Sequence, residues 1–218
     1  MENGAVQGIS VVTTTWNEKE NIEKLILAVK SALRNFPHEM IVVDDSSSDG
    51  TFEVAKRFAE LAVSKPRGGQ TKGLLYGMKL SKFPVVVTID ADLENDPQVI
   101  PSLVERLEKF DLVVASRSCV PRFSERLTSR TMGKMFGVSD FFSNFRAYKR
   151  ETFSDVDLKG GETFGGELLV KAKKRGCRIG EVKIDAPHRR SKPRIGGSIR
   201  ANFRIIVASL KCWMIYLV

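Results

Sequence analysis

The feature that most limits the fold of this chain is an alternation of two sequence patterns. Short apolar runs rich in β-branched residues are typical of buried strands, and between them apolar residues recur at helical spacing. The two patterns alternate at least four times, so we expect a mixed, mostly parallel α/β sheet with helices on both faces. The expected strands are residues 9–15, 40–43, 61–63, 85–89 and 112–115, with helices near 22–33, 52–58, 72–80 and 97–107.

The length and composition indicate one globular domain with a short appendage. The 218 residues are 42% hydrophobic and 28% charged, which suffices for a sizeable core. A helix near 164–175 and a strand near 178–184 are expected to close a domain of residues 1–198, which a C-terminal helix of residues 199–218 follows. The three cysteines have neither metal-ligand nor redox spacing, so we expect free thiols in a cytosolic environment. The sequence shows no signal peptide and no uninterrupted apolar stretch of about 18 residues.

Charged side chains follow three of the expected strands. Asp44 and Asp45 follow the second strand, Asp90 and Asp92 the fourth, and Arg117 the fifth. Ligands of open α/β sheets bind outside the carboxyl ends of the strands. We therefore expect these side chains to meet at one edge of the sheet and to form a ligand site there.

The sequence Asp90-Ala91-Asp92 predicts a metal site. Two carboxylates one residue apart, directly after a buried strand, can converge on Mg²⁺ or Mn²⁺, which takes oxygen ligands and bridges to diphosphate oxygens. A metal in that position stabilises a leaving nucleotide diphosphate. Glu94 is a candidate for a third ligand oxygen. The alternative is a solvated acidic turn that caps the next helix.

Three short segments are expected to start helices. Asp96 is a suitable N-cap residue, and Pro97 follows at the first helical position. Asn17 can cap the first helix, with Glu20 completing a capping box. Residues 49–51, Asp-Gly-Thr, are expected to form a turn and a helix start.

Asp44 and Asp45 are candidates for a nucleotide site, since carboxylates at its mouth accept hydrogen bonds from ribose hydroxyls or a base edge. Asp44 can instead be satisfied by backbone N–H groups of the turn. The basic, glycine-rich loop 65–72 can hold diphosphate oxygens through Arg67, Lys72 and glycine N–H groups. A flexible surface loop is an equal alternative for this segment.

The net charge of +9 points to an anionic partner. Arginines such as Arg117, Arg126 and Arg130 would face the metal site and bind a second phosphate, or else they form an ordinary basic helix face. No acidic residue occurs from residue 186 onward. Residues 188–200 resemble a mobile basic loop that folds over a diphosphate. Residues 199–218 have the pattern of an interfacial membrane helix or of a helix that packs on the core.

Several of these segments, taken in order, resemble a known family. They are residues 11–18 (VVTTTWNE), 43–46 (VDDS), 49–51 (DGT), 89–94 (IDADLE), 115–117 (ASR), 143–148 (SNFRAY) and 194–198 (RIGGS). Together they resemble the family 2 glycosyltransferases of the dolichyl-phosphate mannose synthase group, over roughly residues 9 to 200.

The resemblance implies a GT-A fold and an inverting, metal-dependent transfer of a hexose to a polyprenyl or dolichyl phosphate, with mannose from GDP-mannose as the first expectation. UDP-glucose as donor, or a hydroxyl as acceptor, is the nearest alternative. Together with the residue patterns it assigns roles, with Asp92 and Arg117 as the catalytic candidates. The nucleotide-sugar candidates are Thr14, Trp16, Glu18, Asp44, Asp45, Lys72, Asp90 and Ala91, the metal candidates are Asp90, Asp92 and Glu94, and the acceptor-phosphate candidates are Arg117, Arg130, Lys134, Arg194 and Ser198.

The chain departs from the family pattern at four places. Thr14-Thr15-Trp16 occupies the place of the usual Pro-Thr-Tyr, and Glu94 replaces the common Gln. Residues 142–146 are Phe-Ser-Asn-Phe-Arg, where the family has Thr-Ser-Gly-Phe-Arg. In the closing loop, Ile199 replaces the Lys that commonly follows the serine. These differences bear on the base, the sugar and the acceptor rather than on the reaction class.

The implied chemistry needs no general base, because a lipid phosphate is already ionised at neutral pH. Glu167 stands where relatives with hydroxyl acceptors have a base, and we expect it to pair with a basic residue. The expected partners are a nucleotide sugar, the lipid phosphate and the cytoplasmic surface of a membrane. Nucleic acid is not an expected partner, since acidic strand ends would repel its phosphates.

Overall fold

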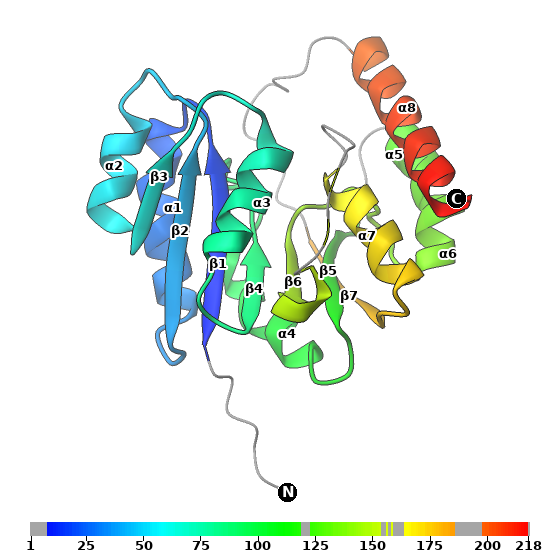
Figure 1. Ribbon diagram of the computed structural model, residues 1–218, viewed down its shortest axis with the longest axis horizontal. Helices are drawn as coiled ribbons and strands as arrows, with labels where there is room; N and C mark the ends of the chain where they lie inside the picture. Colours follow the sequence, from blue (N-terminus) through cyan, green and yellow to red (C-terminus); the bar gives the residue numbers. More distant parts are fainter. Residues whose placement is uncertain are drawn as a thin grey trace, which may run out of the picture.

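The computed structural model of the chain describes residues 8–118, 123–153, 156, 158, 164–185 and 198–217. These residues form one seven-stranded sheet with helices on both faces, as the alternation of patterns predicts (Figure 1). The strand order is β3-β2-β1-β4-β6-β5-β7. The strands are β1 (Ile9–Thr15), β2 (His38–Asp44), β3 (Leu61–Ser64), β4 (Val85–Thr88), β5 (Leu112–Arg117), β6 (Arg146–Lys149) and β7 (Ile179–Ile184).

Strand β1 lies near the middle of the sheet and fixes where a ligand can bind. It pairs in parallel with β2 on one side and with β4 on the other. The chain therefore moves outward from β1 to β3 and then crosses back to β4. Open sheets of this kind bind ligands in the crevice at such a reversal, outside the carboxyl ends of the strands.

Helices bury an apolar layer on each face of the sheet. Residues of α1, α2 and α4 pack with Ile9 and Val11 on one face. Residues of α3, α6, α7 and α8 pack with Val12 on the other, so alternate residues of β1 serve the two layers. The helices are α1 (Lys19–Ala32), α2 (Thr51–Phe58), α3 (Gln70–Leu80), η1 (Pro97–Val99), α4 (Ile100–Arg106), α5 (Phe123–Thr128), the π-helical η2 (Ser129–Gly133), α6 (Lys134–Phe136), η3 (Arg150–Thr152), α7 (Phe164–Lys174) and α8 (Ser198–Leu217).

Two of the three predicted helix starts are confirmed. The Asp96 carboxylate accepts a hydrogen bond from the backbone N–H of Gln98 at 3.0 Å, and Pro97 opens the η1 turn that leads into α4. Gly50 adopts a positive φ of 90° in the predicted turn, and α2 begins at Thr51. A glycine suits this position because other residues rarely adopt that backbone conformation.

The third predicted start, at Asn17, is wrong. Helix α1 begins at Lys19 after Glu18, and no side chain caps it. Asn17 instead has a positive φ of 54°, and its side-chain oxygen accepts a hydrogen bond from the N–H of Ser48 at 3.0 Å. Its amide therefore joins the β1–α1 loop to the β2–α2 loop and does not serve the helix.

Strand β6 was not predicted, and it changes what lies at the ligand edge. It runs antiparallel to both neighbours, β4 and β5, and its first residue, Arg146, pairs with Thr88 at the end of β4. The segment before β6 therefore approaches the edge where the parallel strands end. The hydroxyl of Thr88 donates to the carbonyl of Asn144 at 2.6 Å, which ties this segment to β4.

Helix α8 packs on the domain through one side only. Cys212 is buried among the residues under α7, and the hydroxyls of Ser209 and Thr128 of α5 are 2.6 Å apart. The other side exposes large apolar side chains. No helix in the described part of the chain is long and apolar enough to cross a membrane. The exposed large apolar side chains in the described part of α8 are Phe203, Ile206, Leu210, Trp213, Met214 and Leu217.

Candidate active site

The charged strand ends lie at one edge of the sheet, as expected. Asp44 ends β2 and is in register with Thr15, which ends β1. The N–H of Ile89 still donates to β1 at 3.1 Å, so Asp90 leaves β4 directly beside β1. Arg117 ends β5, and its positive charge acts on Asp90.

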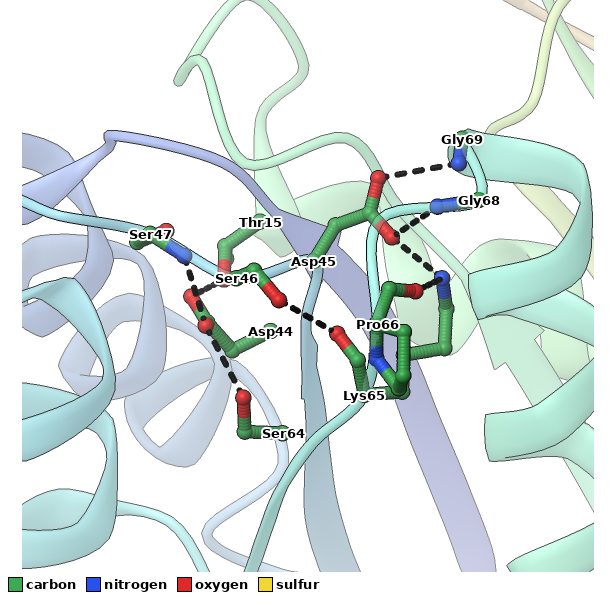
Figure 2. A network of polar contacts seen from close by, with 10 residues as sticks. All are labelled: Thr15, Asp44, Asp45, Ser46, Ser47, Ser64, Lys65, Pro66, Gly68 and Gly69. Carbon is green, nitrogen blue, oxygen red and sulfur yellow. Dashed lines mark hydrogen bonds and ion pairs between the residues drawn. The ribbon is translucent and has the colours of Figure 1, made fainter.

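Asp44 is buried and is bound by its own surroundings. Its carboxylate accepts hydrogen bonds from the Thr15 hydroxyl at 3.2 Å, the Ser47 N–H at 2.9 Å and the Ser64 hydroxyl at 3.4 Å (Figure 2). The sequence left two possibilities for Asp44, a bound nucleotide or the backbone N–H groups of its own turn. In the structure its carboxylate is bound by one turn N–H and by two hydroxyls.

Asp45 binds the loop that connects β3 to α3. Its carboxylate accepts hydrogen bonds from the Lys65 ammonium, from the N–H of Gly68 at 2.8 Å and from the N–H of Gly69 at 2.9 Å (Figure 2). We call these four residues the Asp45 clasp. Burial by itself would raise the pKa of Asp45, but the Lys65 ion pair and the two N–H donors outweigh it and lower the pKa.

The clasp corrects the prediction for this loop. The N–H groups of Gly68 and Gly69, expected to hold diphosphate oxygens, hold the carboxylate of Asp45 instead. Arg67 lies over the Trp16 ring, with its guanidinium carbon 3.4 Å from the ring centroid. Lys72 is exposed in the first turn of α3.

The other nucleotide candidates lie beside this loop. Thr14 lies beneath α3, where a Cβ on Gly73 would overlap its side chain, so the helix approaches β1 closely. Glu18 is buried, and its carboxylate accepts a hydrogen bond from the Asn21 amide at 2.9 Å. Ala91 is buried between the two metal candidates.

Asp90 and Asp92 form a carboxylate pair that fits a divalent cation. Burial and the negative charge of Asp92 raise the pKa of Asp90 to about 7, although the amides of Asn144 and Gln70 and the charge of Arg117 act in the opposite direction. A divalent cation would neutralise this repulsion, and carboxylate oxygens are the ligands that Mg²⁺ and Mn²⁺ take.

Glu94 does not complete the pair in this structure. Its backbone N–H donates to the Asp92 carboxylate at 3.1 Å, which shapes the turn. Within the described ranges, no three or more His, Cys, Asp or Glu side chains gather closely enough to hold a metal. The structure therefore supplies two carboxylates from the protein, and the third ligand expected from the sequence stays a prediction.

Arg117 is held by the carboxylates of Asp140 and Glu125. Its Nε donates to Asp140 at 2.6 Å, and its Nη2 lies 3.7 Å from Glu125. Burial lowers the pKa of Arg117, and the charges of Asp140, Glu125 and Glu94 raise it above its ordinary value. The guanidinium is therefore charged and fixed in place at the end of β5.

Two of the remaining acceptor candidates, Arg130 and Lys134, lie at one cavity. Arg130 and Lys134 line a cavity of about 660 Å³, together with Ser139, which precedes the Arg117 partner Asp140. Ser129, Gly137, Val138 and Glu181 also line it. Arg194 lies outside the described residues, and Ser198 is the first residue of α8.

Comparison with known proteins identifies the family. The family model described as glycosyl transferase family 2 matches residues 10–166, which includes every strand end described above. This chain belongs to that family. The match runs from β1 to the start of α7, and the family resemblance expected from the sequence is confirmed.

Curated relatives of this family 2 chain are longer than it is. The dolichol-phosphate mannosyltransferase of Pyrococcus furiosus is 32% identical over 76% of this chain and 53% of the relative. The undecaprenyl-phosphate 4-deoxy-4-formamido-L-arabinose transferase of Aeromonas hydrophila is 32% identical over 69% and 51%. The dodecaprenyl-phosphate galacturonate synthase of Rhizobium johnstonii is 27% identical over 94% and 67%. The chain thus spans about half of the first two relatives.

Solved structures confirm the GT-A fold. Glucosyl-3-phosphoglycerate synthase from Mycobacterium tuberculosis, in complex with Mn²⁺, UDP and glucosyl-3-phosphoglycerate, matches with a TM-score of 0.78 at 24% identity. The match covers 94% of this chain and 80% of the other. A complex of the same enzyme with phosphoglyceric acid matches equally well, with a TM-score of 0.78.

Three residues of this family 2 site were not singled out from the sequence. Gln70 and Asn144 direct amides at Asp90, and Asp140 holds Arg117. Only Asn144 has a sequence signal, because it stands where the family pattern has glycine. Gln70 and Asp140 have none, since their roles depend on strands that are distant in sequence.

Proposed function

We propose that this family 2 chain transfers a hexose, with inversion and with the help of a divalent metal, from a nucleotide sugar to a polyprenyl phosphate such as dolichyl phosphate. Mannose from GDP-mannose is the first candidate donor. The observation that carries the proposal is the carboxylate pair Asp90 and Asp92 at the end of β4, with the charged Arg117 beside it. The names of the three relatives, all of which contain a polyprenyl or dolichol phosphate, support the lipid acceptor.

The donor side of the proposed site combines the metal pair with the ends of β1 and β2. Asp90 and Asp92 would hold Mg²⁺ or Mn²⁺, and a metal there stabilises the nucleotide diphosphate as it leaves. The Mn²⁺ and UDP named in the M. tuberculosis complex support a metal and a nucleotide at this edge. The residues proposed to surround the nucleotide are Thr14, Trp16, Glu18, Asp44 and Lys72.

The acceptor side supplies fixed positive charge. Arg117 would lie next to the reacting atoms, and Arg130, Lys134, Arg194 and Ser198 would bind the lipid phosphate. An oxygen of that phosphate attacks the anomeric carbon from the face opposite the nucleotide, and the bond to the diphosphate oxygen breaks. The protein acts mainly by bringing two anions together and by neutralising their charge.

The surroundings of Glu167 support a reaction without a general base. Its carboxylate is buried and lies 3.0 Å from the Lys171 ammonium, so the pairing expected from the sequence is confirmed. A carboxylate held in this way has a structural role in α7. This agrees with an acceptor that is already ionised.

A membrane surface is the proposed place of action. Helix α8 exposes its apolar side, and exposed Phe123 and Leu127 of α5 lie on the neighbouring helix. The cations Arg126 and Lys211 are exposed on the same two helices. An apolar surface with cations around it is typical of helices that lie in the interface of anionic membranes.

A donor screen tests the proposal. Radiolabelled GDP-mannose and UDP-glucose are each incubated with the protein, Mn²⁺ or Mg²⁺ and polyprenyl phosphate, and label is counted in the organic phase. We expect one donor to label the lipid, and EDTA or Asp92→Ala to abolish the labelling. Parent-like activity of Asp92→Ala would contradict the metal assignment, and label on a hydroxyl acceptor alone would contradict the phosphate nucleophile.

A further inference from the structure

We propose that Arg67 binds the nucleotide of the donor, and that Asp45 is a positioning residue that acts through Arg67. The class of ligand, a nucleoside diphosphate, rests on the proposed function. The residues and their roles rest on the contacts of the loop between β3 and α3.

The loop around Arg67 is fixed on both sides. Before it, the Lys65 N–H donates to the Asp44 carbonyl at 3.0 Å, and the Lys65 ammonium pairs with Asp45. After it, the N–H groups of Gly68 and Gly69 donate to the same carboxylate. Gly69 has a φ of 84°, a conformation that other residues rarely adopt. One carboxylate thus holds three groups that flank Arg67 (Figure 2).

Because Asp45 already binds the Lys65 ammonium and the N–H groups of Gly68 and Gly69, the group of this loop that we propose for a ligand is the side chain of Arg67. Its guanidinium lies 3.4 Å from the centre of the Trp16 ring, which is the separation of stacked planar groups. No base fits between the two at that distance. Arg67 is exposed, however, so the outer face of its guanidinium is at the surface. Bases stack on guanidinium planes as they do on aromatic rings.

The position of this stack suits a nucleoside diphosphate. Trp16 follows β1, the strand that pairs with β4, and β4 leads to Asp90 two residues after its last residue. A base on Arg67 would lie at this edge of the sheet, where its diphosphate could reach the carboxylate pair and a metal held there. Arg67 then serves twice, since its plane stacks with the base and its charge attracts the phosphates.

Nucleotide binding by four variants tests the proposal. The variants are Arg67→Ala, Arg67→Lys, Asp45→Asn and the double variant Asp45→Asn/Arg67→Ala. The Kd of GDP and of UDP is measured in the presence of Mn²⁺ by titration calorimetry. Arg57→Ala, which removes an exposed cation from α2, is the matched control for the loss of charge.

We expect Arg67→Ala to weaken the better nucleotide about tenfold, which corresponds to a stacked, partly desolvated cation. Arg67→Lys should be nearly as weak, because an ammonium cannot stack as a plane. Asp45→Asn should raise the nucleotide Kd by a similar factor. The double variant should bind the nucleotide no more weakly than Arg67→Ala does. Additive losses in the double variant would show that Asp45 does not act through Arg67.

Trp16 fluorescence provides a readout that a purely structural role would not move. The chain has two tryptophans, so Trp213→Phe leaves Trp16 as the only emitter. In this background and without nucleotide, Arg67→Ala and Asp45→Asn should change the emission alike, and the double variant should match Arg67→Ala. Parent-like emission of Asp45→Asn, at a temperature where melting shows it folded, would overturn the positioning role.

The outcomes separate this inference from the proposed function. If the parent binds a nucleotide but Arg67→Ala binds it within twofold, the role of Arg67 is wrong and the proposed function stands. If the parent binds neither nucleotide with Mn²⁺, both are wrong.

Discussion

At the scale of single residues, the site consists of charged side chains held by hydrogen bonds and ion pairs. Amides hold Asp90, and groups of opposite charge hold Asp45 and Arg117. The charged members were predictable, because Asp44, Asp90 and Arg117 each follow a strong strand pattern. Their partners were not, because the hydrogen bonds of Asp90 to Gln70 and Asn144 join segments that only the folded sheet brings together. The partners of Asp45 in the loop between β3 and α3 were not predictable for the same reason.

The titration of Asp90 gives a prediction for metal binding. Its pKa of about 7 means that below this pH a proton competes with the cation for the carboxylate. We expect the affinity for Mn²⁺ to rise about tenfold per pH unit below 7 and to level off above it. Titration calorimetry in two buffers with different heats of ionisation measures the affinity and the released proton.

A matched variant controls this measurement. Asp90→Asn cannot release the proton, so its weaker Mn²⁺ binding should lose the pH dependence between 6 and 8. A flat profile in the parent, with no proton released, would contradict a metal ligand at Asp90 that titrates near pH 7.

At the scale of elements, strands and helices with a regular apolar pattern were predictable, and a strand that contains a buried charged residue was not. The β-branched runs of β1 and β5 and the apolar period of α1 fix those elements from local sequence. Strand β6 has only four residues, among which Arg146 is buried and donates to the carbonyls of Phe141, Ser143 and Gly165. A buried arginine satisfied by three carbonyls has no local sequence signal, so an antiparallel strand at this place could not be predicted.

The close approach of α3 to the sheet gives a prediction for stability. A Cβ on Gly77 would overlap the Val12 side chain of β1, which is stiff because it is β-branched. We expect Gly77→Ala to lower the free energy of unfolding by about 1–3 kcal/mol, although alanine favours helix. Urea unfolding measures the change. The double variant Gly77→Ala/Val12→Ala should lose less stability than the sum of the two single variants, because the smaller side chain makes room for the new Cβ. Additive losses of unfolding free energy would show that the two residues are not in contact.

Asp111 joins three strands at one end of the sheet, and this gives a prediction for the pH dependence of stability. It directly precedes β5 and bonds to Lys149, which ends β6, and to Arg178, which directly precedes β7. Hydrogen bonds from Arg178, and then from Lys149, hold the pKa of Asp111 far below its usual range. A lowered pKa contributes stability above the unfolded value of about 4, and this stability is lost as the pH falls through the folded pKa. We expect Asp111→Asn to lower the free energy of unfolding by about 1–3 kcal/mol at pH 7.

The same comparison at acid pH tests the sign. The difference between the parent and Asp111→Asn should shrink as the pH falls below about 4, because protonation weakens the same interactions in the parent. Glu53→Gln, which changes an exposed carboxylate on α2, should differ little from the parent at any pH. A difference for Asp111→Asn that grows toward low pH would contradict the assignment.

At the scale of the whole molecule, the GT-A architecture was predictable because each βα unit carries its own pattern. The way in which α8 packs was not, since its sequence suits both a core helix and an interfacial helix. The structure shows a part of each, with Cys212 buried on one side and an apolar row on the other. Two exposed cations, Arg126 of α5 and Lys211 of α8, lie on the same two helices as the exposed apolar side chains.

This apolar row gives a prediction for membrane binding. We expect Leu210→Glu together with Met214→Glu to weaken binding to anionic vesicles at least about tenfold, because burial of each apolar side chain contributes roughly 1.5–3 kcal/mol. Co-sedimentation with phosphatidylserine vesicles measures the change. Leu27→Glu alters an exposed leucine on α1, a helix on the opposite face of the sheet, and should leave vesicle binding unchanged. Parent-like binding of the double variant would show that another surface meets the lipid.

One paired assay distinguishes a lipid phosphate acceptor from a hydroxyl acceptor. The protein receives its labelled donor and Mn²⁺ with either polyprenyl phosphate or the polyprenol of the same chain length, and label is counted in the organic phase. We expect label in the organic phase with the phosphate alone, and none with Asp92→Ala. Label on the polyprenol, or on neither lipid while a sugar hydroxyl is labelled, would contradict a lipid phosphate acceptor.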